Sequence, residues 1–231
     1  LPSVDRILIT DIDNTLIGDD DALAALREQL RKAGDGTAFA VATGRRLQSA
    51  IDVLQEHGAP RPDLWITSVG SQIHYSPDFA ADKEWIRNIS WRWDAQLVAQ
   101  TLRELPGLEL QAAIDQGPHK VSFFIDPAKA PAIPQLDRML RQAGVRSQTI
   151  FSHGQFLDVL PVRASKGLAV RFVAHRWGVP MERVLVAGDS GNDEGMLAGH
   201  SLGVVVANYS PELEKLRSAE RIHFAERPYA W

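Results

Sequence analysis

Short runs of apolar and β-branched residues alternate along this chain with segments of helical pattern. This alternation limits the fold strongly, because consecutive parallel strands need a crossover, usually a helix, and such a sheet is covered on both faces. The expected strands lie at residues 6–10, 38–42, 64–67, 184–187 and 203–206. The expected helices lie at residues 20–33, 45–57, 166–177 and 211–218. The pattern predicts a doubly wound, Rossmann-like α/β core.

The middle of the chain has a different order of expected helices and strands. The expected elements there are a helix near 93–104, a hairpin-like pair at 108–114 and 119–125, a helix near 131–143, and strands at 148–152 and 156–160. The turns between adjacent strands are too short for crossover helices, so the strands should be antiparallel. We therefore predict an inserted α+β domain at residues 79–156, within a core made of residues 1–78 and 157–231.

The composition bounds the class of protein and its partners. No apolar run approaches the roughly 20 residues that span a bilayer, and the first residues lack the basic and apolar regions of a signal peptide. The 25 basic and 29 acidic residues give a net charge of -4, which provides no general attraction to nucleic acid. We expect a soluble, cytoplasmic protein without a nucleic-acid or membrane partner. Because the chain begins at Leu1, we also expect it to be processed or cut from a longer polypeptide.

Two acids follow the first expected strand. Residues two apart in a strand point to the same side, so Asp11 and Asp13 can face one site at the carboxyl end of the strand. Open α/β sheets bind ligands at that edge. A later segment, VLVAGDSGNDEG, places Asp189, Asn192 and Asp193 after another expected strand. If the two strands are neighbours, the acids converge.

Such a cluster of oxygen atoms, without His or Cys, favours a hard cation such as magnesium over zinc. The alternative is that Asp and Gly only form turns after strands. Turn formation can explain either cluster alone, but it explains less well why both follow strands in this order. The pattern thus predicts a magnesium site.

Two further segments carry groups that suit a phosphate. Thr43-Gly44-Arg45 follows the second expected strand, and Lys166 begins an expected helix behind Ser165. A hydroxyl and helix amides can donate hydrogen bonds to phosphate oxygens, and the lysine supplies positive charge. Each feature alone has a structural explanation, since Ser165 suits a helix cap and Lys166 a solvated first turn. Together they indicate a phosphate-binding site.

The ordered set DIDNT at 11–15, ATGR at 42–45, Lys166 and GDSGND at 188–193 resembles the four motifs of the haloacid dehalogenase superfamily of phosphatases. The resemblance covers the whole chain, because the expected insert is similar to the large α/β cap of one branch. Within that branch the motif sequences are most similar to those of sucrose-phosphate phosphatases. They are equally similar to the phosphatase-like domain that follows the glycosyltransferase domain in many sucrose-phosphate synthases. Gln72 departs from the glutamate that this subgroup favours after GS, a difference that bears on substrate preference.

The resemblance implies a two-step mechanism. Asp11 would be the nucleophile that attacks phosphorus, releases the sugar and carries an aspartyl-phosphate. Asp13 would protonate the departing sugar oxygen and then take a proton from the attacking water.

The resemblance also implies the binding groups. Asp11, the main-chain carbonyl of Asp13, and Asp189 would hold Mg2+, with Asp193 at the cation or just behind it. The phosphoryl oxygens would be bound by Thr43, Lys166 and Asn192, and the Gly44-Arg45 turn would lie at the phosphate end. Helix-start arginines such as Arg45 and Arg46 are, however, often solvated.

The insert is expected to act as a lid that recognises the sugar. Lys120, in HKVSFF, and Asp158, in FLDVLP, match polar positions of the family's cap and hinge, and are the candidates for binding sugar hydroxyls. The alternative is an exposed lysine and a turn aspartate. The tryptophans at 85, 91 and 93 can stack on a sugar, but such residues more often anchor a core.

Three functions remain open from the sequence. The first is a magnesium-dependent phosphatase that converts sucrose 6-phosphate to sucrose. The second is a non-catalytic docking or regulatory domain of a sucrose-phosphate synthase, which binds the glycosyltransferase domain in cis or in trans. The third is a phosphatase for another small sugar phosphate, for example of the mannosyl-phosphoglycerate type. The first two can coexist, because tethering raises the local concentration of an intermediate.

Overall fold

The central sheet of the protein has eight strands, most of them parallel. The computed structural model describes residues 4–229. The strand order is β12-β11-β10-β1-β2-β3-β4-β5. Its strands are β1 (Arg6–Thr10), β2 (Thr37–Ala42), β3 (Leu64–Thr67), β4 (Gln72–Tyr75), β5 (Ala80–Ala81), β10 (Val184–Gly188), β11 (Leu202–Val205) and β12 (Ile222–Phe224). Strand β4 pairs in antiparallel fashion with both β3 and β5, and the other pairings of this sheet are parallel. The five strands expected from the sequence are all present in this sheet.

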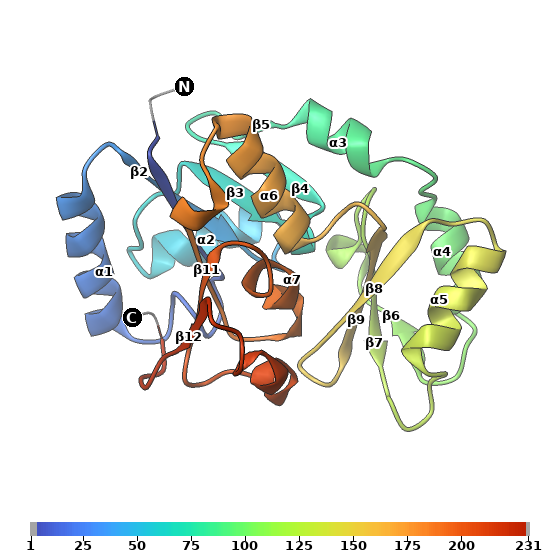
Figure 1. Ribbon diagram of the computed structural model, residues 1–231. Coiled ribbons are helices and arrows are strands. Elements are labelled where there is room, and N and C mark those ends of the chain that lie inside the picture. Colours follow the sequence, from blue (N-terminus) through green and yellow to red (C-terminus); the bar gives the residue numbers. More distant parts are fainter. Residues whose placement is uncertain (1–3, 230–231) are drawn as a thin grey trace.

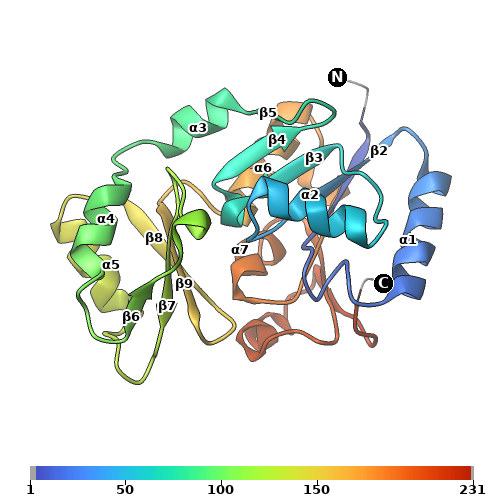
Figure 2. The ribbon, with the colours of Figure 1, turned by 180° about the vertical axis from the view of Figure 1, so that it is seen from behind.

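Helices cover both faces of this sheet. They are α1 (Asp20–Ala33), α2 (Leu47–Glu56), α6 (Lys166–Trp177) and α7 (Glu194–Leu197). Alternate residues of β1 face opposite ways: Ile7 and Ile9 pack in a core cluster with α6, whereas Leu8 packs in another with α1 and α2. Helix α6 lies in front of the sheet in Figure 1, and α2 lies in front in the opposite view of Figure 2. The doubly wound α/β core is therefore confirmed.

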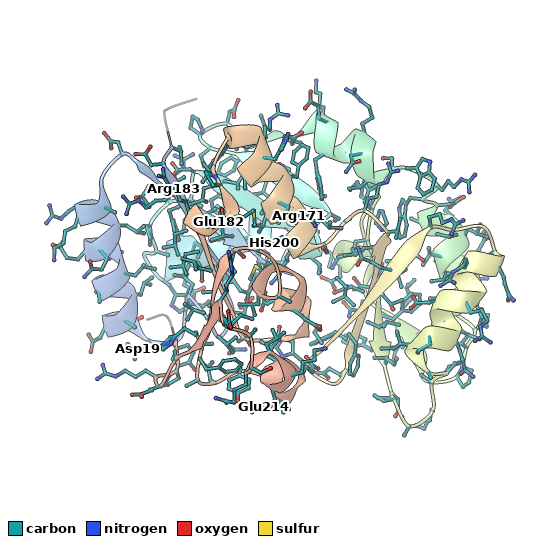
Figure 3. All side chains as sticks on the ribbon, viewed as in Figure 1. Asp19, Arg171, Glu182, Arg183, His200 and Glu214 are labelled. Atoms are coloured by element: carbon teal, nitrogen blue, oxygen red, sulfur yellow. The ribbon has the colours of Figure 1, made fainter. Side chains whose placement is uncertain are left out.

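Local sequence signals set the ends of the two longest of these helices. Asp19, at the start of α1 (Figure 3), accepts a hydrogen bond from the Ala22 amide at 2.9 Å. Ser165 caps α6 in the same way through the Leu168 amide at 3.1 Å. Side-chain caps of this kind satisfy amides that have no partner in the first helical turn. Ser165 therefore fixes where α6 begins, and with it the position of Lys166.

The middle of the chain forms a second, antiparallel sheet of order β6-β7-β9-β8. Its strands are β6 (Leu108–Leu110), β7 (Val121–Ile125), β8 (Ser147–Ser152) and β9 (Phe156–Pro161), and its helices are α4 (Ala95–Leu102) and α5 (Ile133–Gln142). A separate core cluster joins the two helices to the sheet. Figure 1 shows this unit beside the larger sheet, with both helices on the side away from it. The antiparallel sheet backed by two helices agrees with the prediction for the insert.

The ends of the insert differ from the boundaries expected at residues 79 and 156. Strand β9 begins at Phe156 and pairs with β7 and β8, so the small sheet includes the chain as far as Pro161. On the other side, β5 extends the large sheet, and α3 (Lys83–Ile89) packs Trp85 and Ile89 into the core cluster that contains β1. The buried side chains of Trp85 and Ile89 attach α3 to the large sheet rather than to the insert. The sequence pattern alone did not indicate which sheet these two residues would pack against.

Some expected elements have other forms. The segment expected as a helix at 211–218 is a 3-10 helix at Pro211–Leu216, and the strand expected at 108–114 ends at Leu110. Strands β4 and β12 and helix α3 were not expected. Within residues 4–229 no helix has the length and apolar character needed to cross a membrane.

Candidate active site

Three of the predicted motif segments meet at one edge of the large sheet. Asp11 follows β1, Thr43 follows β2 and Asp189 follows β10, and β1 lies between the other two strands. All three strands are parallel, so their carboxyl ends lie together. The Asp11 amide donates to the carbonyl of Ala187 at 2.9 Å, which continues the ladder up to the first acid. The convergence expected from the sequence is thus present in the fold.

Lys166, the first residue of α6, completes the cluster. Its Nζ donates hydrogen bonds to Asp11 Oδ1 and Asp193 Oδ1, both at 2.7 Å. The lysine side chain is 0% exposed. Burial alone would lower the pKa of Lys166, but the two carboxylates outweigh this effect and raise it above its ordinary value. The lysine is therefore a fixed positive charge, and the alternative of a solvated first-turn residue is wrong.

Close backbone contacts hold Lys166 in this position. Gly70 has φ +88°, and a Cβ atom there would lie 2.2 Å from the carbonyl carbon of Ser165. A Cβ atom on Gly167 would lie 2.1 Å from the carbonyl oxygen of Gly195 in α7. Only glycine permits approaches of this kind. The start of α6 is consequently packed directly against the turn before β4 and against α7.

The loop after β10 orders the remaining acids. Asp193 Oδ2 accepts hydrogen bonds from the amides of Asp189 and Ser190, both at 3.1 Å. Thr15 Oγ1 donates to Asp189 Oδ1 at 3.2 Å. Asp193 thus has one oxygen on the backbone of its own loop and the other on Lys166.

The three carboxylates of Asp11, Asp189 and Asp193 suit a divalent cation. Each offers an oxygen atom, and these atoms lie within 4.8 Å of one another in a buried setting. Burial raises the pKa of Asp11 well above its ordinary value, against the opposing effect of Lys166, and the other two carboxylates raise it further. Burial and the charge of Asp193 raise the pKa of Asp189 to about 7. One lysine does not balance three carboxylates, so the site favours a further positive charge held by hard oxygen donors.

Asp13 has a different environment from these buried acids. Arg45 donates two hydrogen bonds to its carboxylate, from Nε to Oδ2 and from a terminal nitrogen to Oδ1, both at 2.7 Å. Arg45 is oriented in turn by Ser49 Oγ at 3.0 Å, and its amide donates to Thr43 Oγ1 at 3.1 Å. The Asp13 side chain is 41% exposed. Arg45 is therefore engaged at the site, whereas Arg46 is exposed.

A cavity of about 280 Å³ lies between the two sheets. The large sheet contributes Asp11, Asp13, Gly44, Arg45 and Asn192 to its lining. The insert contributes Gln111, Asp115, Lys120, Ser152, His153, Phe156 and Asp158. Residues of both units thus face one space.

Lys120 and Asp158, the predicted sugar contacts, lie side by side in this lining. Lys120 Nζ is 3.6 Å from Asp158 Oδ1, and both residues are buried. Ser122, the register partner of Asp158, donates its hydroxyl to the same oxygen. The alternative of an exposed lysine and a turn aspartate is wrong, because both side chains are buried and line the cavity, Asp158 from β9 and Lys120 from the residue before β7. Sequence reasoning missed Gln111, Asp115, His153 and Phe156.

Other candidates lie away from this space. Gln72 Oε1 accepts from Thr67 Oγ1 at 3.3 Å and does not line the cavity. Trp85 is buried in the core cluster of the large sheet, and Trp93 packs on the core of the insert. Trp91 is exposed beneath the guanidinium of Arg163. None of the three tryptophans lines the cavity, and Trp85 and Trp93 serve as anchors.

Comparison with known proteins identifies the family. The family model for sucrose-6F-phosphate phosphohydrolase matches residues 4–231. The chain belongs to the sucrose-6F-phosphate phosphohydrolase family. A solved structure of the sucrose-phosphatase from Synechocystis sp. PCC6803, in complex with sucrose and phosphate, is similar with a TM-score of 0.92 and 34% identity. The match covers 98% of this chain and 93% of that one.

Curated relatives of this phosphohydrolase chain carry two substrate names. Sucrose-phosphatase 1 of Nicotiana tabacum is 32% identical over 98% of this chain, which spans 57% of the tobacco protein's length. Mannosylfructose-phosphate phosphatase of Agrobacterium fabrum is 28% identical over 95% of this chain and 90% of the relative. A sugar phosphatase of haloacid dehalogenase subclass IIB shares the fold, with a TM-score of 0.66 at 16% identity, covering 95% of this chain and 93% of its own. The family match confirms the resemblance to sucrose-phosphate phosphatases, and the structural likeness confirms the fold.

Proposed function

We propose that this protein is a magnesium-dependent phosphatase that hydrolyses sucrose 6-phosphate to sucrose and phosphate through an aspartyl-phosphate on Asp11. The observation that carries the proposal is the buried contact of Lys166 with Asp11 and Asp193, where Asp11 also lines a cavity that the insert helps to form. Family membership supports the same reaction.

In the first step Asp11 attacks phosphorus. Lys166 holds Oδ1, so Oδ2 is the oxygen available for attack. An Asp11 oxygen–phosphorus bond forms while the bond from phosphorus to the sugar oxygen breaks, and Asp13 gives that oxygen a proton. Asp13 is the candidate for this role because it lines the cavity, and Arg45 stabilises the ionised carboxylate that the proton transfer leaves.

In the second step water breaks the aspartyl-phosphate. Asp13, now ionised, takes a proton from the water as its oxygen bonds to phosphorus. The bond from phosphorus to Asp11 then breaks, which frees inorganic phosphate and restores the carboxylate. Lys166, Thr43, the Gly44-Arg45 turn and Asn192 are the groups that would bind phosphoryl oxygens. Asn192 would do so through its Nδ2 group, because the amide oxygen only accepts hydrogen bonds.

Asp11, Asp189 and Asp193, with the main-chain carbonyl of Asp13, would hold the magnesium ion. When bound, the ion offsets the repulsion between the attacking carboxylate and the phosphate. The three buried carboxylates fit this group, because their donor atoms are all oxygens and one lysine leaves them short of positive charge.

The insert would act as a cap that recognises the sugar. We place the cap from α4 to the end of β9, and the core in the rest of the chain. Lys120 and Asp158 would bind sugar hydroxyls from the cap side of the cavity. The similarity to a mannosylfructose-phosphate phosphatase makes that disaccharide phosphate the second candidate substrate.

A docking role for a sucrose-phosphate synthase, in cis or in trans, is compatible with this activity. A domain kept only for binding has no need of Asp11, Asp13, Lys166 and Asp189 together, so we place catalysis first. A cytoplasmic location likewise stays a prediction.

Phosphate release tests the proposal. The substrates are sucrose 6-phosphate, mannosylfructose phosphate, glucose 6-phosphate, fructose 6-phosphate and mannosyl-3-phosphoglycerate, each with magnesium and with a chelator, for the wild type and Asp11→Asn. We expect magnesium-dependent release from sucrose 6-phosphate that the substitution abolishes. Selectivity for another sugar phosphate would change the substrate but keep the chemistry. A folded protein that binds sucrose 6-phosphate without releasing phosphate would support the docking role, and an active Asp11→Asn variant would exclude the aspartyl-phosphate.

A further inference from the structure

The turn between β8 and β9 carries His153 in a left-handed backbone conformation. The Gln155 amide donates to the Ser152 carbonyl at 3.3 Å, and the two residues between them, His153 and Gly154, have φ +51° and +68°. Two successive positive φ values are the pattern of a type I′ turn, which prefers Asn-Gly. Histidine, with asparagine and aspartate, is enriched among the non-glycine residues that adopt a positive φ. The turn therefore accepts His153, and the surroundings of the side chain indicate its role.

This turn lies against the loop that carries the acids. A Cβ atom on Gly191 would lie 2.5 Å from the carbonyl oxygen of Phe151, the residue just before the turn. Figures 1 and 2 both show the β8–β9 turn reaching from the small sheet toward the large one. His153 consequently lines the same cavity as Asp11, Asp13 and Arg45, although it belongs to the insert. It is an exposed side chain at the meeting point of the two units.

Phe156, across the turn, contacts the imidazole of His153. The two rings meet edge to face, with centroids 6.1 Å apart and planes at 84°. Phe156 lines the cavity too, and its ring lies 5.8 Å from that of Phe124, which is 44% exposed. Phe156 and Asp158 are two apart in β9 and share one face of the strand. An apolar ring surface thus adjoins the polar pair of Lys120 and Asp158.

This arrangement matches the two sides of a sugar ring. A pyranose or furanose presents hydroxyl groups at its edge and C–H groups on its face. Aromatic rings contribute apolar contact area, and imidazole nitrogens donate or accept hydrogen bonds. The cavity also holds Asp11, Asp13, Asp115 and Arg45, so His153 lies between the phosphate end and the cap.

We propose that His153 and Phe156 form a specificity element for the sugar of the substrate. His153 hydrogen-bonds a sugar hydroxyl through its imidazole, and Phe156 packs on the C–H face of the same ring. This inference rests on the proposed phosphatase function, and it adds to the contacts of Lys120 and Asp158.

The test compares a sugar phosphate with a substrate that lacks the sugar. We would measure kcat and KM for sucrose 6-phosphate and for p-nitrophenyl phosphate, on the wild type and on His153→Asn, His153→Gly and Phe156→Leu. Both His153 substitutions suit a positive φ, so the hairpin should fold, and thermal unfolding verifies this. His200→Asn is the matched control, since His200 is exposed in the loop before β11, at the edge of the sheet opposite the acids (Figure 3).

We expect His153→Asn and His153→Gly to lower the ratio of kcat/KM for sucrose 6-phosphate to that for p-nitrophenyl phosphate about tenfold, the effect of one lost hydrogen bond. Phe156→Leu should lower the ratio in the same direction, and His200→Asn should leave it within about twofold of the wild type. An unchanged ratio in folded His153 variants, or an equal fall for both substrates, would overturn the inference alone. A wild type without turnover on any sugar phosphate would overturn the proposed function, and the inference with it.

Discussion

Arg45 holds both carboxylate oxygens of Asp13 at 2.7 Å, across 32 residues of sequence. A planar guanidinium matches a carboxylate in this fork geometry and limits its rotation. The contact therefore points the proposed proton donor at the cavity. It also implies that the arginine of the second motif acts on catalysis through Asp13 as well as through the phosphate.

Replacement of Arg45 should separate catalysis from stability. We expect Arg45→Gln to lower kcat at least about tenfold, because Asp13 loses its orientation. The free energy of unfolding should change by less than about 1 kcal/mol, because the ion pair between Arg45 and Asp13 is partly solvated. Arg46→Gln is the matched control, since Arg46 is exposed at the next position. Equal kcat in Arg45→Gln and the wild type would show that Asp13 needs no such support.

The acid cluster should make stability depend on magnesium. At a magnesium concentration 100 times the Kd we expect a gain of about 2.7 kcal/mol in the free energy of unfolding. Asp189→Asn should reduce that gain, measured by thermal unfolding with magnesium and with a chelator. The control is Asp19→Asn, which makes the same chemical change at an exposed helix cap (Figure 3) that asparagine also fills. Equal gains in Asp189→Asn and the wild type would place the ion elsewhere.

The same acid cluster predicts an unusual pH dependence of folding stability when a chelator removes magnesium. The folded pKa of Asp189 is raised to about 7 from an ordinary value of 3.8, so between these values the folded state binds more protons than the unfolded state. Stability should therefore fall as pH rises from about 4 to about 7. The raised pKa of Asp11 acts in the same direction. We expect Asp189→Asn to flatten this part of the profile, whereas a wild-type curve that rises over this range would show that the buried acids do not control it.

Gly70 should be intolerant of a side chain. Gly70→Ala adds a Cβ atom 2.2 Å from the Ser165 carbonyl carbon at φ +88°. We expect a loss of about 3 kcal/mol or more, from left-handed strain and overpacking, with a fall in kcat as Lys166 shifts. Gly178→Ala is the matched control, because Gly178 also has positive φ but has nothing within 4 Å of an added Cβ atom. It should cost about 1–2 kcal/mol without a change in kcat.

Lys120 should act on substrate binding. We expect Lys120→Met to raise KM for sucrose 6-phosphate about tenfold, since a sugar hydroxyl loses a charged donor. Lys129→Met provides the control, because Lys129 is an exposed lysine of the same insert that pairs only with Asp126. A KM for Lys120→Met that equals the wild-type value would remove Lys120 from the sugar site.

The sequence predicted the parts of the fold that depend on local pattern. Buried apolar runs identified five of the eight strands of the large sheet, and strand ends located Asp11 and Asp189. The pairing of β9 with β7 and β8 depends on contacts far apart in sequence, and so the end of the insert was misplaced. Helix α3 was missed because it is short and only two of its residues, Trp85 and Ile89, are buried.

The site followed the same division. Lys166 was found from its motif, but its burial against two carboxylates depends on close packing at Gly70 and Gly167. His153 and Phe156 were missed, because His153 lies in a turn and the pairing of β9 with β8 and β7 brings Phe156 to the cavity. Polar and aromatic residues at alternate positions of a cap strand are a signal that could have indicated them.

The two sheets divide the work of the site between separate pieces of chain. Every carboxylate proposed for phosphoryl transfer belongs to the eight-stranded sheet and its loops, whereas Lys120, His153, Phe156 and Asp158 belong to the four-stranded sheet. Mutations in the small sheet can therefore change the sugar specificity without altering the carboxylates proposed for hydrolysis. Divergence confined to one inserted segment would be enough to give relatives named for sucrose phosphate and for mannosylfructose phosphate on a single ancestral scaffold.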